Sequence, residues 1–476
     1  MFERLLSMSI FFRFPSSSAP GVFVRAAALF LTLTVVTSPA SAQVTVESLT
    51  SSAVSEVGAY HQDVEDAINR FLSRDVEGAR SLLNSARKKT PKLAPPEVML
   101  AQLFFAAGQQ PAGRQELERG IKKFPDDPEA YLILADLDFN EGRFTEAGLL
   151  FAKASALAAK FNENPKRKQN FQMRSFAGMA AVDEARENWE GAKASLTAWV
   201  QLEPNSAAAH QRLARVLFQL DDKKAAYSEL QAAVKADTKT PPAEVLMGNF
   251  YLQAGDKKQA EKFMTAAGKK GAADLATNVA LVQYYLQVNR LSDAQAHAEE
   301  ALKVDPDSLD AKITRGVVAR RQKDYPTARK WLEAAHAQSP TNSLVTNELA
   351  LVLLEQDEPK RALEYAEINQ KLNPNNVEAA ATLGWVNYRS GRKADAQRVL
   401  DAIIKSGNLT PESAYYVAFV IKDQGQVPNA VKLLESALNN DRPFAYRQEA
   451  EALLADLRKK QKDKPAEDSP KKEESK

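Results

Sequence analysis

Two consecutive stretches of equal length decide the fold: LDAKITRGVVARRQKDYPTARKWLEAAHAQSPTN (residues 309–342) and SLVTNELALVLLEQDEPKRALEYAEINQKLNPNN (residues 343–376). They share an early small residue, an alanine after the midpoint and a proline near the end: Gly316 and Ala350, Ala328 and Ala362, Pro340 and Pro374. A 34-residue period of this kind is typical of stacked helix-turn-helix repeats, whose helices bury their apolar stripes only against neighbouring repeats. The sequence therefore predicts an all-α solenoid.

The same pattern recurs along most of the chain. If the late alanine is position 20 of the repeat, its step is 34 residues without a slip through Ala192, Ala226, Ala260, Ala294, Ala328, Ala362, Ala396 and Ala430. Position 8 is small in nearly every copy, as in Gly316 and Gly384, and position 24 is mostly large and apolar, as in Leu332 and Leu400. We therefore expect the small residues to let two helices approach, with the large side chain packed beside them.

Position 15 indicates where the first helix of each repeat ends. It holds glycine or a turn-forming residue in most copies: Gly108, Gly142, Asp221, Gly255, Asn289, Asp357, Gly391 and Gly425. Glycine adopts the left-handed conformation that commonly ends a helix, and Asn and Asp tolerate it. We expect positive φ at this position.

These residues resemble the tetratricopeptide repeat (TPR) family, over about residues 60–444. The resemblance implies an all-α, right-handed solenoid of about eleven repeats, each made of helices A and B. The predicted repeats are residues 60–93, 94–127, 128–172 with an insertion, 173–206, 207–240, 241–274, 275–308, 309–342, 343–376, 377–410 and 411–444.

Segments outside the repeats predict export and an end cap. Residues 1–42 combine arginines, a short apolar run and Ala40-Ser41-Ala42, the pattern of a cleaved secretory signal peptide. A polar leader (residues 43–59) follows, an amphipathic capping helix is predicted over 445–459, and a charged disordered tail over 460–476. The chain is therefore expected in the periplasm or secreted, with no membrane span after cleavage.

One interruption of the period adds 11 residues around FNENPKRKQNF, residues 161–171. Either the flanking helices are lengthened or a loop projects there. Lys166-Arg167-Lys168 within it offers a contact for an acidic partner, although a short charged run is more often a solvated loop.

Composition argues against several kinds of chemistry. Lys and Arg number 63 and Asp and Glu 61, a balance that gives no sign of nucleic-acid binding. The chain has no cysteine, which excludes disulfides and thiolate chemistry, and its four histidines lie in different repeats. It also lacks the common metal, phosphate and nucleophile motifs. We expect a non-enzyme without cofactor or metal.

The TPR resemblance implies a binding groove lined by helix A, near positions 2, 5, 9, 12 and 13. The groove residues predicted to bind a partner are Trp385, Tyr388, Arg389, Tyr415, Phe419, Arg320, Arg321, Asn249 and Gln253. Aromatic residues and arginine are enriched in binding hot spots. Core packing is the competing interpretation: it is favoured for Phe105, Phe139 and Phe218, and it stays open for Trp385, Tyr388, Tyr415 and Phe419.

Two functions follow as hypotheses. The first is an exported, non-catalytic scaffold or adaptor of the cell envelope, which binds an extended segment of a protein partner in its concave groove. The second is a stand-alone subunit of an exopolysaccharide synthesis or export system, in which exposed aromatic residues stack on sugars or contact the polysaccharide machinery. The sequence does not name the partner.

Overall fold

The structure is a computed structural model that describes residues 62–271, 274–406, 409–439 and 443–462. The predicted signal peptide, the leader and most of the charged tail lie outside these ranges. None of the helices in the described ranges is both long enough and apolar enough to span a bilayer.

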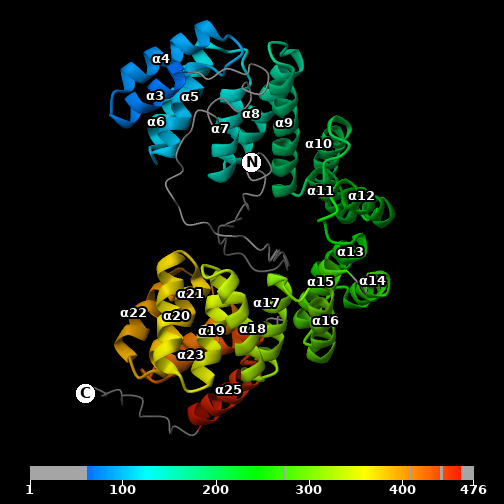
Figure 1. Ribbon diagram of the computed structural model, residues 1–476, viewed down its shortest axis with the longest axis vertical. Helices are drawn as coiled ribbons and strands as arrows, with labels where there is room; N and C mark the ends of the chain where they lie inside the picture. The colour runs from blue at the N-terminus through cyan, green and yellow to red at the C-terminus, as the bar shows by residue number, and fades with distance from the viewer. Residues whose placement is uncertain (1–61, 272–273, 407–408, 440–442, 463–476) are drawn as a thin grey trace, which may run out of the picture. The chain divides into compact units, whose positions relative to one another are not determined.

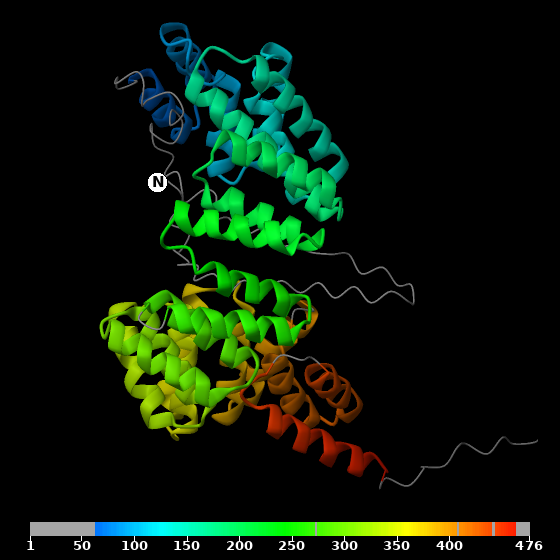
Figure 2. The same ribbon diagram turned by 90° about the vertical axis from the view of Figure 1, so that its right-hand side faces the viewer.

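Helices make up the regular structure of the described ranges and alternate along the chain as the A and B helices of eleven repeats (Figures 1 and 2). The A helices are α3 (Gln62–Leu72), α5 (Pro96–Ala106), α7 (Glu129–Asn140), α9 (Pro165–Ala185), α11 (Ala207–Gln219), α13 (Ala243–Gln253), α15 (Leu275–Gln287), α17 (Leu309–Arg321), α19 (Ser343–Glu355), α21 (Val377–Arg389) and α23 (Pro411–Lys422). The B helices are α4 (Val76–Lys89), α6 (Gln110–Lys123), α8 (Phe144–Lys160), α10 (Trp189–Leu202), α12 (Lys223–Ala236), α14 (Lys257–Lys270), α16 (Leu291–Val304), α18 (Tyr325–Gln338), α20 (Pro359–Leu372), α22 (Lys393–Ser406) and α24 (Val427–Leu438). A last helix, α25 (Arg447–Lys462), follows the eleventh pair.

The chain divides into two compact units, a division that the sequence did not predict. The first unit ends at Ala260 and the second begins at Glu261, within α14. The first unit contains α3 to α13, and the second contains α15 to α25.

Every repeat turns from helix A to helix B through one left-handed residue at position 15. The five expected glycines have φ between 74° and 81°, and Asp221, Asn289 and Asp357 have φ between 58° and 65°. Arg74, Glu187 and Lys323 adopt the same conformation in the remaining repeats. The expectation of positive φ at position 15 is confirmed, and the turn imposes it even on residues with a poor preference for it.

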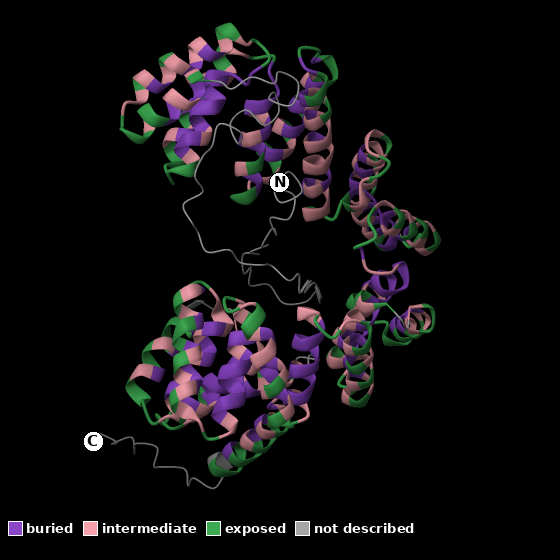
Figure 3. Ribbon diagram, in the orientation of Figure 1, coloured by how far each residue is buried: buried purple, intermediate pink, exposed green. Residues whose placement is uncertain are grey.

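The small and large positions of the repeat pack against each other as expected. A Cβ at Gly316 would lie 2.6 Å from Cγ of Leu332, and one at Gly384 would lie 2.6 Å from Cδ2 of Leu400. Side chains at position 24 therefore occupy the space that a larger residue at position 8 would need. Each B helix buries one stripe, such as Ala328, Leu332 and Ala335 of α18. The A helices of the second unit are buried on most sides (Figure 3).

The insertion lengthens two helices and does not form a projecting loop. Helix α8 has 17 residues and α9 has 21, whereas the preceding α6 and α7 have 14 and 12. The interpretation of Lys166-Arg167-Lys168 as a solvated loop is wrong for Arg167, whose side chain is fully buried. Its Nη2 lies 3.0 Å from Asp127 and 2.7 Å from Glu129, and its guanidinium packs on the rings of Phe161 and Phe171.

Helix α25 begins two residues later than the predicted cap. It packs on α24 through the buried side chains of Ala450, Leu454 and Leu457, and Arg458 pairs with Glu435 at 2.8 Å. Residues 443–446, which precede α25, are not helical. They do not pack as part of the cap, and their contacts belong to the candidate site.

Candidate functional site

The candidate site lies on the A helices of the last four repeats, all within the second unit. We call it the A face of repeats 8–11. It is defined by position 9 (Val317, Leu351, Trp385, Phe419) and position 12 (Arg320, Leu354, Tyr388, Lys422). Successive A helices contact one another from α17 through α19 and α21 to α23, so these positions are neighbours in space.

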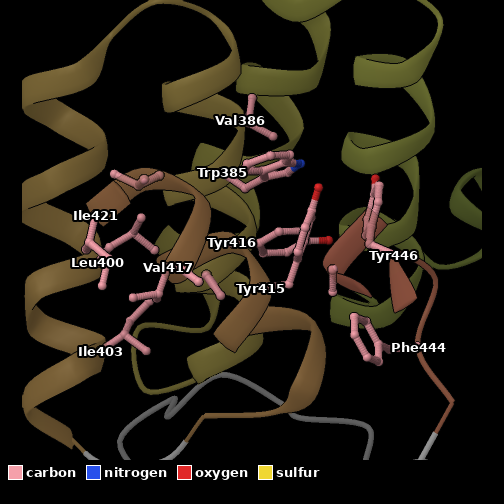
Figure 4. Close-up of a cluster of buried hydrophobic side chains, with 14 of the residues drawn as sticks. Trp385, Val386, Leu400, Ile403, Tyr415, Tyr416, Val417, Ile421, Phe444 and Tyr446 are labelled. Atoms are coloured by element: carbon pink, nitrogen blue, oxygen red, sulfur yellow. The ribbon is translucent and has the colours of Figure 1, made fainter. Parts of the chain in front are cut away.

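An aromatic cluster occupies the middle of this face (Figure 4). The ring of Trp385 stacks on Tyr416 with centroids 4.9 Å apart and lies 5.8 Å from Tyr415. Tyr446, from the segment before α25, stacks on Tyr415 with centroids 5.4 Å apart and an angle of 11° between the rings. Trp385, Tyr415 and Tyr416 are at most 4% exposed. Stacked aromatic pairs contribute beyond the area they bury, so this cluster is a rigid part of the core.

A buried ion cluster connects the first repeat of this face to the last. Arg320 of α17 binds both carboxylate oxygens of Glu348 on α19, with Nη2 to Oε1 at 3.1 Å. Its Nη1 donates to Glu412 of α23 at 3.1 Å, across 92 residues of sequence. Tyr416 also donates to Glu412, at 2.8 Å. A buried arginine that satisfies two carboxylates is the arrangement that makes a buried charge tolerable.

Burial controls the titration of these groups. It raises the pKa of Glu348 despite the opposing charge of Arg320, and it raises that of Tyr415 to about 12. Burial also opposes ionisation of Glu412, but its contacts with Arg320 and Tyr416 outweigh this cost and lower its pKa. The carboxylate that accepts donors from two helices is therefore the one whose pKa is lowered.

The edge of the face is polar and accessible. Tyr388 is half-buried, and its hydroxyl donates to Asp423; burial and this hydrogen bond raise the pKa of Tyr388 to about 12. Arg389 is exposed, and its guanidinium lies 5.4 Å from the ring centre of Trp385. Lys422 lies 4.1 Å from the ring centre of half-buried Phe419. These cations cover aromatic rings that would otherwise face water.

The non-helical residues before α25 lie against this face. Nη1 of Arg321 donates to the carbonyl of Pro443 at 3.5 Å, and the Tyr446 hydroxyl donates to Oε1 of Glu355 at 3.0 Å. Phe444 and Tyr446 are both buried. In the first turn of α25, Glu449 pairs with Lys323 at 2.6 Å.

The corresponding positions of the first unit differ in kind. In repeats 2–6, position 9 holds Gln102, Asp136, Ala181, Arg215 and Asn249, none of which is buried, whereas Ile68 of the first repeat is buried. Asn249 is half-buried and Gln253 is exposed. Asp136 pairs with Arg174 of the next repeat at 2.7 Å.

The structure separates the predicted site residues into two groups. Tyr388, Arg389, Phe419, Arg321, Asn249 and Gln253 keep accessible surface, whereas Trp385, Tyr415 and Arg320 are buried. Tyr446, Tyr416 and the two carboxylates cover these three side chains, so none of them is an accessible groove contact in this structure, and their part in partner binding stays a prediction. For the earlier aromatics, Phe139 and Phe218 are buried and Phe105 is half-buried against Gly113.

Sequence reasoning missed the residues that close the face: Glu348, Glu355, Glu412, Tyr416, Phe444 and Tyr446. A signal was present in the printed sequence, because position 9 changes from mostly polar in repeats 2–6 to apolar in repeats 8–11. A run of apolar residues at one repeat position indicates a buried surface. Within the described ranges, no group of three or more His, Asp or Glu is placed to hold a metal ion.

These observations define a class of protein: an all-α array of helical hairpins with a 34-residue period. Two family models, both described as tetratricopeptide repeat, match the chain, one at residues 98–160, 279–343 and 347–415 and the other at 184–244. Together these segments cover more than half of the chain, which belongs to the tetratricopeptide repeat family. TPR proteins generally mediate protein–protein interactions.

Known proteins resemble parts of this chain. The TPR repeat-containing protein PA4667 of Pseudomonas aeruginosa is 32% identical over 108 residues, which are 21% of this chain and 18% of that protein. The chain thus matches less than a fifth of that relative's length.

Two solved structures illustrate the likeness. PilF of Pseudomonas aeruginosa has 22% identity and a TM-score of 0.35, covering 47% of this chain and 96% of its own. Yeast Tom70 has 14% identity and a TM-score of 0.37, covering 84% of this chain and 96% of its own.

Proposed function

We propose that this protein is a non-catalytic scaffold or adaptor of the cell envelope that holds an extended segment of a protein partner along its A helices. Membership of the TPR family supports the protein-binding part of the proposal. The secretory pattern of residues 1–42 supports the location.

One observation carries the proposal: the A face of repeats 8–11 already holds a short non-helical segment. Residues Pro443–Tyr446 lie on it with a backbone carbonyl bound by Arg321 and an aromatic ring stacked on Tyr415. A backbone contact plus a buried aromatic anchor is how a surface recognises an extended peptide. The accessible residues of this face, Tyr388, Arg389 and Phe419, are the proposed contacts of the partner. Asn249 and Gln253 of the first unit stay predicted contacts of that unit alone.

The exopolysaccharide alternative depended on aromatic rings available for stacking on sugars. In this structure Trp385 and Tyr415 are 1% and 4% exposed, and their faces are covered by other rings. We therefore propose the protein-binding function in preference to it.

A site-directed cross-linking experiment tests the binding proposal. A photoreactive amino acid replaces Arg389 on the A face or, as a matched control, Arg398 on α22, whose side chain is 77% exposed. In the native envelope fraction we expect position 389 to label one non-helical stretch of a partner protein, and Tyr388→Ala/Phe419→Ala to reduce this labelling at least about tenfold. Equal labelling from position 398 would contradict the assigned face.

The location has its own test. N-terminal sequencing of the chain purified from the envelope fraction is expected to begin at Gln43, directly after Ala42. A chain that retains residues 1–42 in the cytosol would contradict the envelope part of the proposal and leave the binding part standing.

A further inference from the structure

Residues 443–449, which run from the non-helical residues before α25 into its first turn, make contacts that an end cap does not need. A solenoid cap covers the last repeat, and α25 does so by packing Ala450, Leu454 and Leu457 near α24. Residues 443–449 instead reach repeats 8 and 9, where they bind Arg321, Lys323 and Glu355. The partners in these contacts are separated by 91 to 126 residues of sequence. Capping and occupation of the A face are thus two separate tasks of this C-terminal region.

The contacts have the composition of a recognition motif. The segment reads PFAYRQE, with two aromatic residues separated by one alanine and a carboxylate three residues after the second. Phe444 is buried in the hydrophobic cluster of the last repeats, Tyr446 stacks on Tyr415, and Glu449 pairs with Lys323. Tyr446 and Glu449 thus have defined partners on repeats 8–11, as the anchors of a bound peptide do, and Phe444 adds a buried apolar side chain beside them.

The fit is incomplete at its polar atoms. Within the described residues, buried Nη2 of Arg321, Nε1 of Trp385 and Oε2 of Glu449 have no hydrogen-bond partner. An unpaired buried donor or acceptor lowers the stability of a contact. A segment that supplied acceptors to the arginine and the tryptophan would therefore bind better than the chain's own residues.

We infer that residues 443–449 are an internal ligand of the A face of repeats 8–11, and that a partner segment with the same spacing of aromatic, aromatic and acidic residues displaces them. The inference rests on the proposed function, because it names the chemistry of the extended segment that the face accepts. The tethered segment acts at an effective concentration on the order of millimolar, so it suppresses binding of a free competitor.

A peptide competition tests the inference on the full chain. The probe is a synthetic peptide of residues 443–450 with capped ends, and the opened protein carries Tyr446→Ala and Glu449→Gln. We expect the peptide to bind the opened protein at least about tenfold more tightly than the wild type, because the binding-competent fraction rises. A peptide with alanine at its Tyr446 position should lose this binding. Circular dichroism confirms that the opened protein keeps its helices; equal binding to both proteins, or none to the opened one, overturns the inference.

A reversible lock gives a second readout that does not depend on the opened variant. Because the chain has no cysteine, Lys323→Cys/Glu449→Cys can be joined by a reducible thiol cross-linker. We expect the locked protein not to bind the peptide and binding to appear on reduction. Unchanged binding after reduction would place the peptide on another surface and overturn the inference.

The two proposals fail separately. If the peptide does not bind but position 389 still labels a partner, the internal-ligand inference is wrong and the scaffold function stands. If the peptide binds in both tests but no envelope protein is labelled, residues 443–449 are an internal ligand, and the proposal that the chain binds an envelope protein is wrong.

Discussion

The A face of repeats 8–11 and the A helices of repeats 2–6 share a scaffold and differ in what covers it. Both sets have the same left-handed turn at position 15 and alanine or glycine at position 20. At position 9 the first unit has Gln102, Asp136 and Asn249, whereas the second has Leu351 and Trp385, which are buried. The repeat thus fixes the backbone, and the residue at position 9 determines whether the face stays polar or becomes part of a core.

This difference in what covers the A helices indicates where a partner can bind. In the second unit, the buried ring of Tyr415 is covered by Tyr446, and half-buried Arg321 binds the carbonyl of Pro443. In the first unit, the corresponding positions are partly exposed and make surface ion pairs such as Arg174 with Asp136. A partner can therefore bind the A helices of the first unit directly. On the A face of repeats 8–11 it must compete with residues 443–449 of the chain itself.

Of the variants that test this comparison, replacement of Arg320 is expected to change the free energy of unfolding most. Arg320→Met leaves Glu348 and Glu412 buried without their cation, so we expect the free energy of unfolding to fall by about 3–5 kcal/mol. Hydrogen exchange should lose protection in α17 to α23 and keep it in α5 to α11.

Two matched variants sharpen this result. Arg167→Met removes the buried partner of Asp127 and Glu129 and should cost a similar amount in the first unit. Arg398→Met removes an exposed charge and should cost less than about 1 kcal/mol. A loss below about 1 kcal/mol for Arg320→Met would mean that the ion cluster does not hold the A face together.

Exchanges at position 9 test the comparison directly. Leu351→Gln places an amide among buried apolar side chains, so we expect about 2–4 kcal/mol of destabilisation in urea unfolding. Gln102→Leu changes a partly exposed residue of the first unit and should stay within about 0.5 kcal/mol of the wild type. Equal effects of the two exchanges would show that the two faces do not differ in burial.

Alkaline titration tests whether Tyr446 covers Tyr415. The pKa of Tyr415 is raised to about 12 by burial, above its ordinary value of 10.0. The folded state therefore holds this proton more tightly than the unfolded state, and the resulting stabilisation is fully present below pH 10 and lost as the pH rises through 12. NMR of ¹³C-tyrosine-labelled protein, which resolves single tyrosines, should show the pKa of Tyr415 moving toward 10 in Tyr446→Ala; an unchanged pKa of Tyr415 would contradict its coverage by Tyr446.

The smallest expected effect concerns the turn between helices A and B. Glu187 is exposed and has φ of 56°, so Glu187→Gly should raise the free energy of unfolding by about 0.5–1 kcal/mol. Lys323→Gly relieves the same strain at φ of 62° but loses the ion pair with Glu449, so its gain should be smaller. Thermal melts of the two variants compare the values, and a larger gain for Lys323→Gly would argue that Glu449 contributes nothing.

The sequence predicted the all-α repeat fold, the packing of Gly384 against Leu400 and the left-handed turns, because each depends on residues within one repeat. It did not predict the division at Ala260 or the closure of the A face. Closure requires Arg320 to contact Glu412, 92 residues away in sequence, and Tyr446 to contact Glu355, 91 residues away. A 34-residue period relates neighbouring repeats only, so it does not predict contacts between residues so far apart in sequence. The burial of Arg167 was missed for the same reason, since its carboxylates lie 38 and 40 residues away.

Hydroxyl-radical footprinting with mass spectrometry tests the central claim, that residues 443–449 cover the A face of repeats 8–11. In the wild type, Trp385 and Tyr415 are predicted to oxidise slowly, while the accessible side chains Tyr388 and Phe419 react. In Tyr446→Ala/Glu449→Gln, Trp385 and Tyr415 should become several-fold more reactive, with Phe105 of the first unit unchanged. Wild-type Trp385 and Tyr415 that oxidise as fast as Phe419 would contradict the account.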